Sequence, residues 1–200
     1  AGYAGWFEGR VNFNGPLGYG WTWNYNVSLS DGPGGELVMR WGDGKTEVWE
    51  PDGVNWKPMY GVFSTLIESP DNVFTLRRKD LVEFRFDIDR KLTAVVDEFG
   101  NAITFTYSGS NLTSITETAG RAVTLSYDAS DRITNVLDPI GRSASFAYDA
   151  SGNLITAVNL EGGITRYTYD ASHEMLTITD PNGNVALTNT YDEARGVVVS

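Results

Sequence analysis

The sequence predicts an all-β protein, in which repeated β-hairpins form a continuous coiled antiparallel sheet with little or no helix. Three residue types recur in phase, with successive tyrosines 20, 21, 21 and 22 residues apart. The recurring positions are an aromatic residue, usually followed by aspartate, then a glycine and an apolar residue. They are Phe86-Asp87, Tyr107, Tyr127-Asp128, Tyr148-Asp149, Tyr169-Asp170 and Tyr191-Asp192; Gly100, Gly120, Gly141, Gly162 and Gly183; and Leu92, Leu112, Ile133, Leu154 and Met175. Self-similarity at a fixed period indicates a repeat architecture.

Each repeat contains two short segments with the pattern of a strand. In residues 103–107 apolar or aromatic side chains alternate with threonine, which is the two-residue period of a strand. A second segment follows at residues 112–115, and repeats close with turns such as Asp138-Pro-Ile-Gly141. Proline presets φ in such a turn, and glycine adopts the left-handed conformation at little cost. Because a lone hairpin is unstable in water, the hairpins are expected to pair side by side.

The first part of the chain has a different texture. All six tryptophans lie within residues 1–83, which we interpret as a Trp-rich hairpin section preceding the repeats. Residues 84–200 form about five repeats, the last of them incomplete. Strand-like segments of the first section are 21–29, 36–41, 45–49, 73–76 and 81–86, and Gly42-Asp43-Gly44 is a hairpin signal.

Composition excludes several classes of partner. The net charge of −11 and the pI near 4.4 argue against nucleic acid and anionic membrane surfaces. No apolar run approaches the roughly 20 residues of a membrane-spanning helix, so no membrane insertion is expected. The absence of cysteine removes disulfides, thiolate metal sites and cysteine nucleophiles.

No motif predicts catalysis, a cofactor or a metal. The single histidine, His173, falls in a turn, which is a poor place for a Ser-His-Asp site. The repeated aspartates are interpreted as turn residues that accept backbone N–H bonds. The run at 180–184 lacks the alternating acidic ligands of a calcium loop. We therefore expect no enzyme, although the inventory of carboxylates alone leaves a two-carboxylate glycosidase open.

The tryptophans are the best candidates for binding. Trp21, Trp23, Trp41 and Trp49 are tentative ligand-binding residues, because aromatic faces stack on sugars and apolar partners. The alternative is that Trp21, Trp23 and Tyr25, spaced by two, line one face as core or as a plug at the end of a spiral. Both interpretations stay open at this stage.

The motifs resemble a known family. Tyr-Asp, a Leu-Thr-x-Val-like strand and Asp-Pro-x-Gly are similar to the YD repeat of the RHS family, over residues 84–200. That family includes bacterial polymorphic toxins, the C components of Tc toxins and the animal teneurins. Residues 15–25, Gly-Pro-Leu-Gly-Tyr-Gly-Trp-Thr-Trp-Asn-Tyr, resemble the opening of the domain that precedes these repeats in bacterial members.

The resemblance implies a sheet that closes as a shell around a cargo polypeptide. We expect a non-enzymatic structural or scaffold segment, secreted or on the cell surface. Its expected partners are further YD repeats or copies of itself, joined through exposed strand edges into a filament or tube. Glycans or an encapsulated polypeptide are further candidate partners. The alternative function is a carbohydrate-binding or cell-adhesion module that uses the N-terminal tryptophans.

Overall fold

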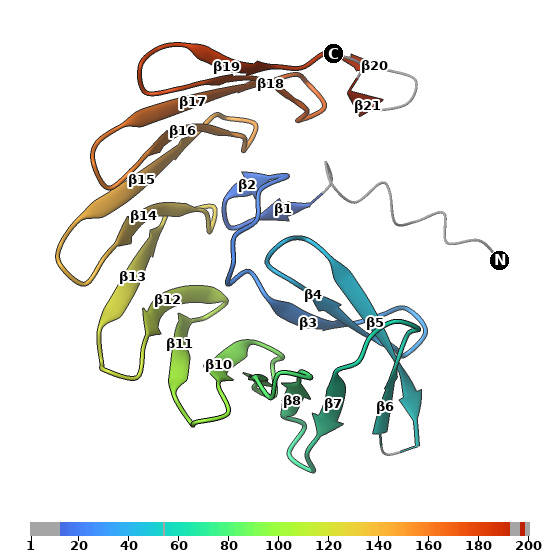
Figure 1. Ribbon diagram of the computed structural model, residues 1–200. Helices are drawn as coiled ribbons and strands as arrows, with labels where there is room; N and C mark the ends of the chain where they lie inside the picture. The colour runs from blue at the N-terminus through green and yellow to red at the C-terminus, as the bar shows by residue number, and fades with distance from the viewer. Residues whose placement is uncertain (1–12, 54, 193–196, 199–200) are drawn as a thin grey trace. The chain divides into compact units, whose positions relative to one another are not determined.

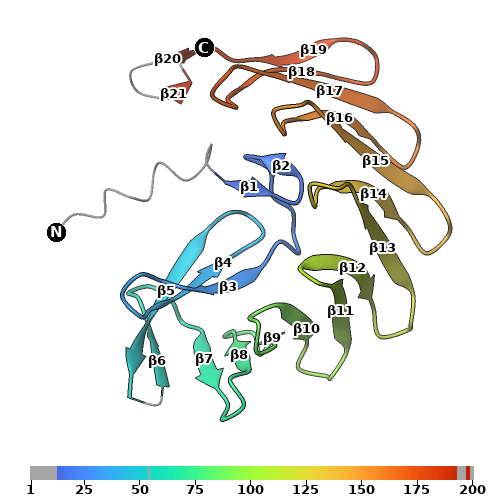
Figure 2. The same cartoon turned by 180° about the vertical axis from the view of Figure 1, so that it is seen from behind.

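The structure, a computed structural model, describes residues 13–53, 55–192 and 197–198 (Figures 1 and 2). Its strands are β1 (Asn14–Gly15), β2 (Gly18–Tyr19), β3 (Ser28–Asp31), β4 (Leu37–Arg40), β5 (Thr46–Asp52), β6 (Asn55–Pro58), β7 (Thr65–Glu68), β8 (Phe74–Arg77), β9 (Glu83–Phe86), β10 (Leu92–Val96), β11 (Ala102–Ser108), β12 (Asn111–Thr116), β13 (Ala122–Tyr127), β14 (Ile133–Leu137), β15 (Ser143–Tyr148), β16 (Leu154–Val158), β17 (Ile164–Tyr169), β18 (Met175–Thr179), β19 (Val185–Thr188), β20 (Tyr191–Asp192) and β21 (Val197–Val198). No helix occurs in these ranges, and the predicted all-β fold of consecutive hairpins is confirmed.

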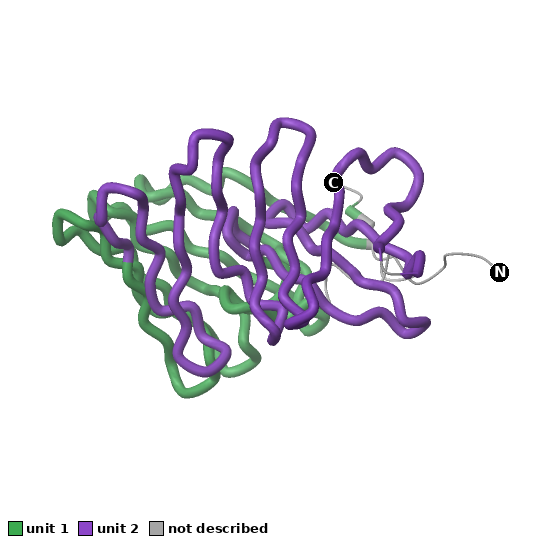
Figure 3. The backbone as a smooth tube through the Cα atoms, turned by 90° about the horizontal axis from the view of Figure 1, so that it is seen from below, with its two compact units in different colours: residues 1–21, 124–200 green, residues 22–123 purple. Residues whose placement is uncertain are grey.

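The chain forms two compact units, coloured separately in Figure 3. The first, called unit 1, contains residues 1–21 and 124–200. The second, called unit 2, contains residues 22–123. Each is described by itself below. The boundary placed between residues 83 and 84 from the sequence stays a prediction.

In unit 1 the strands β13 to β19 pair in sequence order, each antiparallel to the next. The register shifts in every hairpin beside the repeat tyrosine, where the second strand carries one extra residue. Tyr148 pairs with Leu154 while Ala147 pairs with Thr156, so Ile155 has no opposite partner. Such bulges increase the local right-handed twist. A bulge in each repeat therefore gives the sheet a regular coil.

Unit 2 holds a second meander, in which β3 to β12 pair consecutively. Its first strand also meets a turn much later in the chain. An antiparallel bridge joins Ser28 to Lys91, and the Arg90 guanidinium lies 2.6 Å from the Asp31 carboxylate. Both ends of β3 are thus held by the turn that follows β9.

The core follows the strand alternation that the sequence predicts. In β4 Leu37 and Met39 are fully buried while Val38 and Arg40 are half-buried, as the two-residue period requires. Trp49, Phe74 and Phe86 are the largest fully buried side chains of unit 2: Trp49 is 0% exposed, and the two phenylalanines are each 2% exposed. In unit 1 the buried apolar residues are Leu125, Ile133 and Leu154.

One predicted strand is wrong. We expected residues 21–29 to be extended, but the strand starts at Ser28. Before it the Asn26 N–H donates to the Trp23 carbonyl at 2.8 Å, which forms a turn. Gly42 packs against this turn: a Cβ at Gly42 would lie 2.4 Å from the Asn24 carbonyl oxygen. The turn and the close approach replace the ladder that an alternating pattern alone would predict.

Candidate functional site

The aspartates of the Tyr-Asp pairs bind the backbone of their own turns. Asp128 Oδ1 accepts hydrogen bonds from the backbone N–H groups of Ser130 at 2.9 Å and Arg132 at 3.0 Å. The equivalent oxygen of Asp170 accepts from the N–H groups of Ser172 and Glu174 at 2.8 and 2.9 Å. A carboxylate that holds two backbone donors in this way is occupied by the turn.

The turns at the other ends of the hairpins use the same chemistry. Asp138 Oδ1 accepts from the N–H groups of Ile140 and Arg142, and Asp180 Oδ1 accepts from those of Asn182 and Asn184. Asn159 takes this position in one repeat, and its Oδ1 accepts from Glu161 and Gly163. An amide oxygen therefore serves as well as a carboxylate oxygen, which shows that the position requires an acceptor and no charge.

These contacts explain the acidity of the turn carboxyls. At Asp128 burial raises the pKa, but hydrogen bonds from the Arg132 side chain and from backbone N–H groups outweigh burial and lower the pKa overall. The pKa of Asp180 is lowered first by the side-chain hydrogen bond from Asn184 and then by backbone N–H groups. Low pKa values keep these groups ionised at neutral pH, so they suit hydrogen-bond acceptance and not proton donation.

The repeat tyrosines link each hairpin to the one before it. The Tyr148 hydroxyl donates to the Ile133 carbonyl oxygen at 2.6 Å, and the Tyr169 hydroxyl donates to the Leu154 carbonyl oxygen at 2.9 Å. Tyr107 reaches Leu92, and Tyr191 reaches Met175, in the same manner at 3.0 and 2.9 Å. Each acceptor is the repeated apolar position of the preceding hairpin. We call this contact the tyrosine latch.

From the sequence these tyrosines were named as repeat positions, and the hydroxyl contact was not predicted. The signal was present, because each of these four tyrosines lies 15 or 16 residues after the apolar position that accepts its hydrogen bond. Burial raises the pKa of Tyr169 to about 12, while the hydrogen bond that it receives from Trp21 lowers the pKa by less.

Trp21 belongs to this tyrosine row in unit 1. Its Nε1–H donates to the Tyr169 hydroxyl at 2.8 Å, and its ring meets the edge of the Tyr167 ring at 4.9 Å. The preceding hairpin of β1 and β2 contacts another hairpin of the sheet, since the Ile133 N–H donates to the Pro16 carbonyl at 2.7 Å. Trp21 thus contacts the sheet of unit 1 through both its N–H and its ring, and its assignment as a plug or as a ligand-binding residue stays a prediction.

His173 contacts the hairpin of β1 and β2 through Tyr19. Its ring stacks on Tyr19 with a centroid distance of 3.6 Å, and Nδ1 lies 2.6 Å from Asn153 Oδ1. The backbone of His173 is left-handed, with φ 66°, and in the equivalent turn position Gly152 has φ 90°. Neither described contact gives the imidazole the two partners of a catalytic triad.

The other three candidate tryptophans, Trp23, Trp41 and Trp49, lie in unit 2 and differ in accessibility. Trp49 is 0% exposed, so both of its faces are covered by protein. Trp23 is half-buried, and its ring meets Tyr25 edge-on at 5.9 Å. Trp41 lines a pocket of unit 2.

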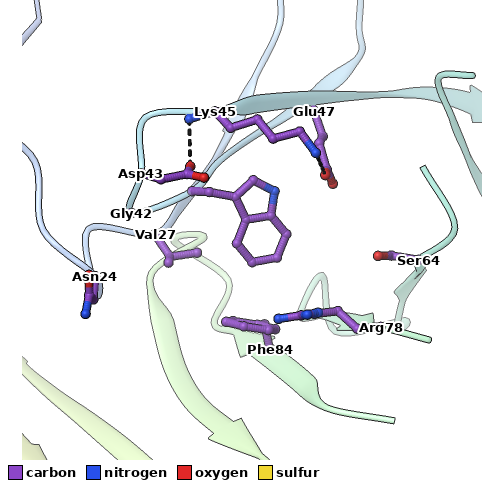
Figure 4. A pocket seen from close by; sticks show the side chains of 10 residues that line it. Asn24, Val27, Gly42, Asp43, Lys45, Glu47, Ser64, Arg78 and Phe84 are labelled. Carbon is purple, nitrogen blue, oxygen red and sulfur yellow. Dashed lines mark hydrogen bonds and ion pairs between the residues drawn. The ribbon is translucent and has the colours of Figure 1, made fainter. Parts of the chain in front are cut away.

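This pocket has a volume of about 440 Å³. It is lined by Asn24, Val27, Trp41, Gly42, Asp43, Lys45, Glu47, Ser64, Arg78 and Phe84. Figure 4 shows Lys45 and Glu47 on one side and Phe84 and Arg78 on the other. The Phe84 ring meets the Trp41 indole edge-on, with a centroid distance of 5.0 Å. Glu47 lies on the same face of β5 as the buried Trp49, so the pocket lies on the core side of this strand.

Glu47 is the unusual residue of the pocket. It is 9% exposed, and its Oε1 accepts from Lys45 Nζ at 2.8 Å. Its second oxygen, Oε2, is buried and has no hydrogen-bond partner among the described residues. A buried acceptor without a partner costs about 1–3 kcal/mol of stability.

Residues 13–53, 55–192 and 197–198 contain no group of three or more His, Asp or Glu side chains placed to hold a metal ion. The same ranges contain no apolar helix of membrane-spanning length.

The hairpin repeat with its tyrosine latch and aspartate turns defines a sheet of repeated hairpins that are bonded to one another. A model of the Teneurin YD-shell family matches residues 53–197. The chain therefore belongs to the Teneurin YD-shell family, and the predicted membership of the RHS/YD-repeat group is confirmed.

Among solved structures, one similar chain comes from the crystal structure of TcdB2-TccC3-Cdc42. The two chains are 12% identical with a TM-score of 0.21, and the match covers 82% of this chain and 15% of that one. This chain thus spans a small part of the length of that structure's chain. No curated protein matches the sequence.

Proposed function

We propose that this chain is a non-enzymatic structural segment of a YD-repeat shell that works outside the cell, secreted or on the cell surface. The observation that carries the proposal is the use of the repeated polar groups by the fold itself. The aspartates accept turn N–H bonds and the tyrosines donate to neighbouring backbone carbonyls. Groups copied in every repeat for these purposes are not a catalytic set. Membership of the YD-shell family supports the same role.

We also propose that the repeats begin near residue 84, after a Trp-rich section of residues 1–83. The turn after Phe86 supports this boundary because it has the hydrogen bonds of the later turns. Asp87 Oδ1 accepts from the Lys91 N–H at 2.9 Å, and the Arg90 N–H donates to the Asp87 carbonyl at 2.9 Å. For Asp192 the side chain lies outside the described part of the chain.

The strand β19 is the proposed site of assembly with further repeats or with copies of this chain. All four residues of β19 are exposed, including Val185 at 61% and Leu187 at 39%. Exposed apolar strands invite pairing with another chain. An encapsulated polypeptide is a further proposed partner of such a shell.

The experiment is a measurement of molar mass by light scattering over a range of protein concentrations, with negative-stain images of the same samples. We expect particles larger than the 22.0 kDa chain that dissociate on dilution. The double variant Val185→Lys, Leu187→Lys should weaken assembly, because charges on an edge oppose pairing. Ile140→Lys is the matched control, since Ile140 is 77% exposed in the turn between β14 and β15. A monomer at every concentration, or equal effects of both variants, would contradict assembly through β19.

A second candidate function is a carbohydrate-binding or cell-adhesion module. The specific observation in its favour is the pocket of unit 2, which combines the half-buried Trp41 with several polar side chains. Quenching of tryptophan fluorescence by neutral oligosaccharides tests it directly. A flat titration with every oligosaccharide would contradict it.

A further inference from the structure

We propose that the pocket around Trp41 and Glu47 is a subsite for one unit of a neutral saccharide. This inference deepens the second candidate function and rests on it. It assigns binding to one pocket, to one class of ligand and to named residues, whereas the sequence predicted only four candidate tryptophans. The proposal has three supports: an unpartnered buried acceptor, an aromatic floor and a balanced charge.

The buried acceptor is Glu47 Oε2. The Glu47 side chain is 9% exposed and lines the pocket. Its Oε2 atom has no hydrogen-bond partner among the described residues. The other oxygen is fixed by Lys45 at 2.8 Å, so the carboxylate cannot turn away without losing that contact. Buried acceptors in proteins almost always have a donor. A ligand hydroxyl in the pocket would supply it.

The aromatic floor is the indole of Trp41. Phe84 holds it edge-on at a centroid distance of 5.0 Å, which fixes the orientation of the ring. Trp41 is half-buried and therefore keeps part of its surface open to the pocket. A flat apolar surface suits the C–H face of a pyranose ring, whose hydroxyls then point sideways to polar groups.

The charges around the pocket cancel. Asp43 and Glu47 are opposed by Lys45 and Arg78, so neither a cationic nor an anionic ligand gains a net attraction. The pocket also mixes hydrogen-bond donors with acceptors, and a hydroxyl group is both. The volume of about 440 Å³ lies in the range of small-molecule sites, whose walls combine apolar surface with a few polar groups. A neutral sugar meets all of these conditions.

The test is a fluorescence and calorimetric titration of the whole chain with maltotetraose, cellotetraose and tetra-N-acetylchitotetraose. We expect at least one of them to bind the native protein. The Trp41→Ala and Glu47→Gln variants should weaken binding by at least about ten-fold. Trp21→Phe is the matched control, because Trp21 bonds to Tyr169 in unit 1 and should bind as the native protein does. Circular dichroism of each variant verifies folding, and Trp41→Phe provides a milder change.

Each outcome separates this inference from the function on which it rests. Binding that survives Trp41→Ala but is lost in Trp21→Phe or Trp23→Phe would overturn the pocket and leave the adhesion function standing. No binding of any of the three oligosaccharides would overturn both. If the peptide Gly-Arg-Gly quenches the native protein but not Trp41→Ala, while no saccharide does, the pocket binds a polypeptide and the saccharide assignment is wrong.

Discussion

The two units are built from similar strands and similar aspartate turns, but they differ in how completely their buried polar side chains find partners. In the repeats, aspartates bond the turns and tyrosine hydroxyls bond backbone carbonyls of the previous hairpin. All five buried side-chain atoms found without a partner in the described residues belong to unit 2. They are Trp23 Nε1, Glu47 Oε2, Trp49 Nε1, Ser69 Oγ and Arg90 Nε.

The difference shows what a repeated sequence secures. A pattern copied every 21 residues or so places each donor beside an acceptor at the same spacing, so satisfying one repeat satisfies all of them. The hairpins that precede residue 84 in unit 2 lack this period and depend on packing large aromatic side chains such as Trp49 and Phe74. Their unpaired groups cost stability, and they also leave chemistry available for a ligand.

The largest expected effect concerns packing in unit 2. We expect Trp49→Ala to lower the free energy of unfolding by about 3–5 kcal/mol, because Trp49 is 0% exposed and its removal leaves a cavity. Urea denaturation followed by circular dichroism measures it. Trp41→Ala is the comparison, and its loss should be clearly smaller because Trp41 is half-buried. Equal losses would mean that Trp41 is also a core residue and not the floor of an open pocket.

The tyrosine latch provides the next prediction. Tyr169→Phe removes the donor to the Leu154 carbonyl and the acceptor of the Trp21 Nε1–H. We expect a loss of about 1–3 kcal/mol in unfolding free energy, because partners are left unsatisfied.

The control for the latch is Tyr167→Phe. The Tyr167 ring touches Trp21, but its hydroxyl makes no hydrogen bond with a described residue, so the substitution should be nearly neutral. If the two substitutions cost the same in urea denaturation, the latch contributes nothing specific.

The turn aspartates predict an acid limit to stability. The folded pKa values of Asp128, Asp138 and Asp180 lie below the ordinary value of 3.8, so the contribution of these three groups is complete above that value and is lost as the pH falls through the folded pKa. Thermal unfolding between pH 7 and pH 2 should show a fall that begins near pH 4. Asp138→Asn should keep the turn, as Asn159 does in its repeat, and remove the part of the fall that Asp138 causes. An unchanged pH profile in this variant would contradict the assignment.

The smallest effects are expected at the left-handed turn positions. Gly141 has φ 88° with nothing within 4 Å of an added Cβ, so Gly141→Ala tests backbone strain alone. We expect a loss of about 1–2 kcal/mol in unfolding free energy. Leu81 has φ 65° and is 42% exposed, and Leu81→Gly should raise the melting temperature slightly. A lower melting temperature for Leu81→Gly would mean that its side-chain contacts outweigh the strain.

Much of the fold could be predicted because its signals are local. The alternation at residues 103–107 predicted β11, and the Asp-Pro-Ile-Gly turn predicted the left-handed glycine at Gly141. The predicted strand at 21–29 failed because the same alternation was overridden by the turn at Trp23 and Asn26. Local patterns cannot show that a distant glycine packs against them.

The candidate site could be predicted only in part. Trp41 was named among the binding candidates, but Glu47 and Phe84 were not. Glu47 comes near Trp41 through the pairing of β4 with β5, and Phe84 comes from the later strand β9, so their proximity depends on the fold. The tyrosine latch was also missed, although its constant spacing of 15 or 16 residues is written in the sequence. A hydrogen bond from a hydroxyl group to a backbone carbonyl does not change the residue composition of a strand, so composition does not reveal it.

Amide hydrogen exchange, resolved by residue, tests most directly the claim that the repeated groups serve the fold. We expect the turn N–H groups of Arg132, Asn153 and Glu174 to exchange as slowly as those of the adjacent strands, because aspartate carboxylates hold them. Exchange at these positions as fast as in an unstructured peptide would contradict the claim. The aspartates would then be free at the surface and open to another role.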